Sequence, residues 1–213
     1  MKRLPLFLGI ALGTALGWLA FDPPAPRPAS ANSSGPPLAK TAAPGEGVCT
    51  DCHGGNVVNP DALGSVTIDG VPTSYLPGHT YPLTVTVQRT GQQRWGFELT
   101  ALKTADATAA GTITITNTIT RMGSLSGRTY VEQTTVNGAD GTFTGQTSGS
   151  WDFGWTAPAA GAGAVTFYAA GNAANGDQSN SGDLIYTKTA SSLEGSATDV
   201  SATTWGRIKM LYR

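Results

Sequence analysis

The chain has 213 residues, of which 13% are charged, and its formal net charge is -1. This length suits one ordinary domain with extensions and argues against two large domains. Because Lys and Arg are not in excess, the composition also argues against binding to nucleic acid or to an anionic membrane surface. The 28 Gly and 13 Pro, together with many Thr, are typical of short strands joined by turns.

The first 31 residues have the pattern of an export signal. Lys2 and Arg3 precede an uncharged, largely apolar stretch that runs from Leu4 to Phe21. We therefore exclude residues 1–31 from the fold. The best cleavage site is Ala29-Ser30-Ala31, but about 17 apolar residues also reach the lower limit for spanning a bilayer, so an uncleaved membrane anchor is the alternative. Both alternatives place the remaining chain outside the cytoplasm, as a periplasmic, cell-surface or secreted protein.

Residues 32–47 form a second region without strand or helix periodicity. They are rich in Pro, Ala and Gly. A segment of this composition buries too little apolar surface to offset the entropy lost on ordering. We therefore predict an extended linker here.

The segment 48–63 contains the one motif that carries specific chemistry, Cys49-Thr50-Asp51-Cys52-His53. Two thiols at this spacing can add to the two vinyl groups of one haem, and the following His can ligate the iron. The motif predicts a covalent c-type haem held by Cys49 and Cys52, with His53 as the proximal ligand. One alternative is a disulfide, because these are the only cysteines and the compartment is oxidising. A thioredoxin-type redox pair is the other, although its βαβ context is missing.

The sixth iron ligand has several candidates in the sequence. His79 is the only other histidine and lies in a turn just before an expected strand, so bis-histidine ligation is our first expectation. Met122 and Met210 could supply a thioether, although Met more often fills a core. A vacant position or a ligand from a neighbouring chain completes the alternatives. The choice matters because axial ligands determine both reduction potential and access to the iron.

Beyond the motif, β-rich runs alternate with turn signals such as Pro77-Gly78 and Asn137-Gly138. Leu83, Val85 and Val87 alternate with polar residues, which is the period of a strand with one buried face. Many short strands of this kind indicate an all-β, two-sheet sandwich. We expect eight strands, at residues 65–68, 81–88, 95–102, 111–120, 129–135, 150–155, 164–170 and 184–189.

Three segments, at residues 94–101, 155–158 and 167–176, closely resemble the bacterial reeler-like "choice-of-anchor V" proteins. The resemblance covers residues 45–189. It implies an immunoglobulin-like (reeler-like) β-sandwich at 64–190, preceded by a haem-attachment segment and followed by a C-terminal extension at 191–213. Relatives often carry His at the place of Gln133. If that His is the distal ligand of the family, this chain lacks it.

A Gly-rich segment near the C-terminal end of the expected sandwich gathers amide and carboxylate oxygens that could hold calcium. The simpler interpretation is that these residues make turns. The residues are Asn172, Asn175, Asp177, Asn180 and Asp183.

These observations predict an exported monohaem cytochrome c that transfers electrons to an unidentified redox partner. A Ser-His-Asp arrangement cannot be defended from the sequence, so we expect an electron carrier rather than an enzyme. One alternative is a matrix or adhesion module that self-associates into an oligomer or filament through free sheet edges, with haem as a structural or relay element. The other is a haem-based sensor of small molecules, which requires an open sixth position.

Overall fold

The structure is a computed structural model that describes residues 32–53 and 57–196. The predicted export signal, Gly54 and Gly55 after the motif, and Met210 lie outside the described residues. In the part of the chain that is described, no helix is long and apolar enough to cross a membrane.

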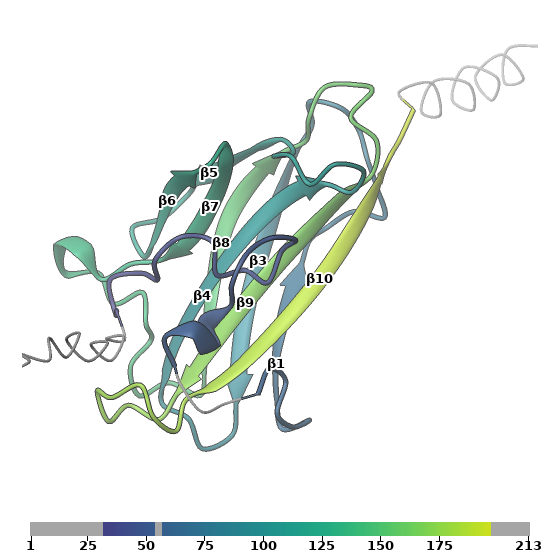
Figure 1. The fold of residues 1–213 in the computed structure, drawn as a ribbon. Helices are drawn as coiled ribbons and strands as arrows, with labels where there is room; N and C mark the ends of the chain where they lie inside the picture. Colours follow the sequence, from purple (N-terminus) through teal and green to yellow (C-terminus); the bar gives the residue numbers. More distant parts are fainter. Residues whose placement is uncertain (1–31, 54–56, 197–213) are drawn as a thin grey trace, which may run out of the picture.

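Two β-sheets form the body of the molecule (Figure 1). The four-stranded sheet has the order β1 (Gly64–Asp69), β3 (Thr80–Arg89), β8 (Ser148–Thr156), β5 (Thr112–Ile115). The six-stranded sheet has the order β2 (Ser74–Tyr75), β10 (Leu184–Glu194), β9 (Val165–Ala174), β4 (Arg94–Lys103), β7 (Arg128–Gln133), β6 (Thr120–Leu125). Neighbouring strands are antiparallel except β2 and β10. The predicted all-β sandwich is confirmed.

The core lies between the two sheets and follows the alternation expected from the sequence. On β3, Leu83, Val85 and Val87 are at most 1% exposed. Phe97 of β4 stacks on Trp151 of β8, with ring centroids 4.5 Å apart, so aromatic side chains join the two layers. Burying one such side chain contributes roughly 1.5–3 kcal/mol, and a well-oriented aromatic pair adds about 0.5–1.5 kcal/mol.

Two strand assignments differ from the expectation. The stretch 111–120 is not one strand, because β5 pairs in the four-stranded sheet and β6 begins at Thr120 in the six-stranded sheet. Asn117 makes the turn between them, since its side-chain oxygen accepts hydrogen bonds from the backbone N–H groups of Ile119 and Thr120. The sandwich also extends beyond residue 190, because β10 continues to Glu194 and pairs there with the short strand β2.

Residues 32–47 are not an extended linker. Figure 1 shows this purple segment crossing the sheet that contains β4 and β9. Thr41 is 1% exposed and Ala43 is 3% exposed. The backbone N–H groups of Ala39 and Lys40 donate to Glu98 on β4. These polar contacts with the sheet stabilise an ordered position that the apolar content of the segment does not predict.

Candidate functional site

The C-x-x-C-H motif forms a single turn on the outer face of the six-stranded sheet. A short 3₁₀ helix, η1, spans Cys49–Asp51. The backbone oxygen of Cys49 accepts hydrogen bonds from the N–H groups of Cys52 (3.2 Å) and His53 (2.9 Å). Cys49 packs against Ala170 of β9 and Ile185 of β10. The turn therefore gathers both thiols and the imidazole, and Cys49 anchors it to the sheet.

Both cysteines are free thiols in the structure. Burial, together with the smaller effect of nearby Glu98, raises the pKa of Cys49 to about 12. A redox-active cysteine pair depends on a thiol whose pKa is lowered, because the thiolate is the nucleophile. The environment of Cys49 therefore argues against a thioredoxin-type pair.

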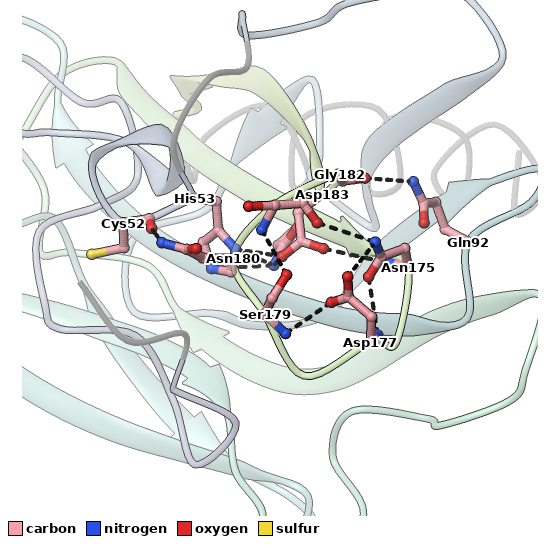
Figure 2. Close-up of polar contacts among 11 residues, drawn as sticks. Cys52, His53, Gln92, Asn175, Asp177, Ser179, Asn180, Gly182 and Asp183 are labelled. Atoms are coloured by element: carbon pink, nitrogen blue, oxygen red, sulfur yellow. Dashed lines mark hydrogen bonds and ion pairs between the residues drawn. The ribbon is translucent and has the colours of Figure 1, made fainter. Parts of the chain in front are cut away.

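His53 is held by a buried carboxylate from the far end of the chain (Figure 2). Its Nδ1 lies 2.5 Å from Oδ2 of Asp183. The Asp183 side chain is 1% exposed and that of His53 is 13% exposed. The side-chain nitrogen of Asn172 lies 3.3 Å from both ring nitrogens of His53. Because the Asp183 carboxylate can only accept, its contact places a proton on Nδ1 and directs the lone pair of Nε2 away from Asp183.

The loop between β9 and β10 supplies a second contact to the motif. Asn180 donates from its side chain to the backbone oxygen of Cys52, at 2.8 Å. Within the loop, Asp177 accepts a hydrogen bond from the N–H of Ser179, and Asp183 accepts one from the N–H of Asn175. Figure 2 shows the sulfur of Cys52 pointing away from these polar contacts.

The same loop contains the calcium candidates of the sequence. In the described ranges, no group of three or more His, Cys, Asp or Glu side chains is placed to hold a metal ion. The structure instead brings Asn180 and Asp183 to the C-x-x-C-H motif. Asn172, Asn175 and Asp177 bond to the loop or to His53.

A cavity of about 290 Å³ opens beside the motif. Its volume is at the lower end of the range for small-molecule sites, roughly 300–1,000 Å³. Gly96 contributes to its lining, and a Cβ at that position would lie 3.0 Å from the Gln133 side-chain nitrogen. The oxygen of Gln133 accepts a hydrogen bond from the Phe97 N–H, at 2.7 Å. Residues from five parts of the chain line the cavity, among them Pro36, Pro37, Lys40, Cys49, Cys52, His53, Arg94, Trp95, Gln133, Asn172 and Asp183.

Gln133 therefore lines the same cavity as His53. This is the position at which the family resemblance leads us to expect a histidine. The structure thus places Gln133 and the predicted proximal ligand, His53, at the same cavity.

The structure does not bring His79 to this cavity. His79 lies in the turn before Thr80, which pairs with Thr156, and its ring contacts Tyr81. The cavity lies near the other end of β3, because its lining residue Trp95 packs beside Gly149, the partner of Val87. The length of β3 between Thr80 and Val87 separates the two places by on the order of 20 Å.

The weaker candidate for the sixth ligand, Met122, does not lie at the cavity either. It lies on β6, is 48% exposed and does not line the cavity. Neither of the two candidates within the described residues is therefore placed to face His53.

Two buried carboxyl groups lie side by side beneath the N-terminal segment. Glu98 of β4 and Glu132 of β7 are cross-strand partners and are at most 1% exposed. Burial is the main cause that raises the pKa of Glu98 to about 8, the N–H of Lys40 opposes the rise, and the neighbouring Glu132 contributes to it. Burial also raises the pKa of Glu132 to about 7, against the lowering effect of Arg121.

A third carboxylate fastens the N-terminal segment to β7. Glu46 accepts hydrogen bonds from the Arg128 guanidinium and from the Tyr130 hydroxyl, at 2.5 and 2.8 Å. Its other oxygen accepts from the Thr41 hydroxyl. Together with the contacts of Glu98, these bonds determine where the N-terminal segment, which leads directly into the motif, lies on the sheet.

Comparison with known proteins yields structural likeness only. No protein-family model matches the sequence, and no curated protein sequence matches it. Similar solved structures include the human F-spondin reeler domain, which is 22% identical with a TM-score of 0.44 over 67% of this chain and 96% of that chain. The Reelin-N domain of F-spondin is 23% identical with a TM-score of 0.45 over 70% of this chain and 96% of that chain.

A cohesin module from a family 33 glycoside hydrolase of Clostridium perfringens is 13% identical, with a TM-score of 0.41 over 63% of this chain and 98% of that chain. All three TM-scores are below 0.5, so the all-β assignment rests on the two sheets of the chain itself. The family named from the sequence stays a prediction.

Several residues of the site have no signal in the sequence that links them to the motif. Asp183 and Asn180 belong to a turn-rich segment that suggests only calcium binding or turn formation, and neither interpretation predicts their contacts with the motif. Glu98 occupies an outward position between Phe97 and Leu99, where alternation predicts exposure. Only the spacing of the motif itself identifies the site.

Proposed function

We propose that this chain is an exported c-type cytochrome that carries one covalent haem and transfers electrons outside the cytoplasm. One observation supports this above the others. The C-x-x-C-H residues form one turn beside a cavity of about 290 Å³, and a buried carboxylate holds the His53 ring so that Nε2 can act as a ligand.

The residues around the cavity fit such a group. Cys49 and Cys52 both line the cavity as free thiols, so each can form one thioether bond. His53 would ligate the iron through Nε2. The side-chain oxygen of Asn172, which also lines the cavity, is buried and has no hydrogen-bond partner among the described residues. Leaving such an atom unpaired costs roughly 1–3 kcal/mol, and a bound group that donates to it would remove this cost.

The chain's own residues then perform two tasks. Cys49 anchors the attachment turn to the sheet, and Asp183 orients the His53 ring. A bound haem supplies reversible one-electron chemistry at iron, with a potential that depends on axial ligands, hydrogen bonding and burial. Cys52 remains partly exposed, which leaves an edge of the site that a redox partner can approach.

The test is covalent haem in the full chain produced together with a c-type maturation system. We expect the wild type to keep haem on a denaturing gel and to show the sharp reduced spectrum of a c-type cytochrome. Cys49→Ser and Cys52→Ser should each lose one thioether and shift the reduced spectrum to longer wavelength, and the double variant should lose covalent haem. His79→Gln is the matched control and should keep it. A wild type without covalent haem, or a double variant that retains it, would overturn the proposal.

A further inference from the structure

We infer that Asp183 is a positioning residue that lowers the reduction potential of the iron bound by His53. The inference rests on the proposed function and specifies how this chain would adjust it. Two elements distant in sequence, the motif turn and the start of β10, meet in the contact between His53 and Asp183.

The contact is short and shielded from water. Oδ2 of Asp183 lies 2.5 Å from Nδ1 of His53, and the carboxylate is 1% exposed. Hydrogen bonds in which one partner is ionised are about twice as strong as neutral ones. They are also stronger in a protein interior than in water, because the local dielectric constant is lower.

Asp183 is itself held in place by its neighbours. Its second oxygen, Oδ1, accepts a hydrogen bond from the Asn175 N–H at 3.2 Å, and the Asn172 side chain lies 3.5 Å from Oδ2. The loop that ends at Asp183 is tied to the motif through Asn180 and the backbone oxygen of Cys52. The carboxylate and the imidazole are therefore positioned relative to each other by contacts on both sides.

The chemical consequence follows from the charge of the acceptor. A carboxylate that accepts the Nδ1 proton fixes the tautomer and makes Nε2 a more basic ligand. Ferric iron carries one more positive charge than ferrous iron and gains more from a basic ligand. Asp183 therefore favours the oxidised state, and each tenfold preference lowers the potential of a one-electron couple by about 59 mV.

The decisive variant is Asp183→Asn, which keeps the shape and an acceptor oxygen but removes the charge. We expect redox titration of the holoprotein to show that the preference for the ferric state falls at least tenfold. The reduction potential would then rise by about 59 mV or more. Asp177→Asn is the matched control, because Asp177 lies in the same loop and bonds Ser179 and Asn175 rather than His53. An unchanged potential in Asp183→Asn, or an equal rise in both variants, would refute the inference.

A second measurement does not depend on whether Asp183→Asn folds or on whether haem is bound. In the full wild-type chain made without haem, ¹⁵N NMR of His53 reports which ring nitrogen carries the proton at the high-pH limit. We expect the proton on Nδ1, and His79→Gln assigns the two histidines. A proton on Nε2 would contradict the inference. Absence of covalent haem in the wild type would refute the proposed function while leaving this result interpretable.

Discussion

The Glu98→Gln substitution removes a buried ionisable group beneath the N-terminal segment while it preserves side-chain shape and an acceptor for Ala39 or Lys40. Glu98 is fully buried, and burial raises its pKa from 4.5 to about 8. Between those values the folded chain binds more protons than the unfolded chain. The stabilisation is therefore fully present below pH 4.5, decreases as the pH rises, and is lost above about pH 8.

The magnitude follows from the interval between the two pKa values. At about 1.4 kcal/mol for each factor of ten in proton affinity, the shift of Glu98 corresponds to an upper limit of about 5 kcal/mol. We expect the free energy of unfolding of the wild type to fall between pH 5 and pH 9 by several kcal/mol more than that of Glu98→Gln. Glu132 is present in both proteins, and its charge contributes to the raised pKa of Glu98, so the difference between the profiles reports Glu98 together with its interaction with Glu132.

The assay is urea unfolding at pH 5, 7 and 9, followed by tryptophan fluorescence, with Glu194→Gln as the control. Backbone N–H groups of Gly161 and Gly163 lower the pKa of Glu194 below its usual 4.5, so this group does not titrate in the measured range. The control should therefore parallel the wild type. Parallel profiles for the wild type and Glu98→Gln would refute the reasoning.

Two further substitutions test the geometry of the sandwich and of the site. His79→Ala should leave the oxidised and reduced optical spectra of the holoprotein unchanged, because His79 lies at the end of β3 remote from the cavity; conversion from low-spin to high-spin haem would contradict this. Gly171→Val should lower the free energy of unfolding in urea by about 1–3 kcal/mol through overpacking. A Cβ at Gly171 would lie 2.5 Å from Val87 and 2.6 Å from Val66, so an unchanged unfolding midpoint would contradict the described packing.

Much of the fold could be predicted because it follows from local alternation. Leu83, Val85 and Val87 are inward-facing in the structure as the period of two requires. Each of the eight expected segments contains a strand. The turn at Asn117 could not be predicted, because Thr and Ile continue an acceptable strand pattern across it. Strand β2 could not be predicted either, since its two residues are a strand only through pairing with the end of β10.

The candidate site likewise contains residues that the sequence predicts and residues that it does not. Cys49, Cys52 and His53 are identified by spacing alone, and the structure gathers them in one turn. Asp183 could not be linked to them, because the partners are 130 positions apart and a loop of Asn, Asp and Gly has a sufficient explanation in turn formation. Contacts of this kind depend on strand register, which a single sequence does not reveal.

Burial of Glu98 shows how two sound local expectations can fail together. Alternation on β4 directs Phe97 and Leu99 to the core and Glu98 to the outer face, which predicts an exposed carboxylate. Composition predicts an extended linker at residues 32–47. The first expectation assumes that the outer face of β4 is in contact with water, and the second assumes the same of residues 32–47. In the structure the segment covers the outer face, and the backbone N–H groups of Ala39 and Lys40 meet the carboxylate.

The register of β4 therefore determines both the core contacts on its inner face and the site contacts on its outer face. Phe97 faces inward onto Trp151, while the flanking outward positions, Gly96 and Glu98, face the cavity and the N-terminal segment at residues 32–47. A slip of one residue would exchange the two faces of the strand, placing the carboxylate in the core and an aromatic ring against the N-terminal segment. The packing of the core thus stabilises the geometry of the site, because the register that buries Phe97 is also the one that presents Glu98 to Lys40.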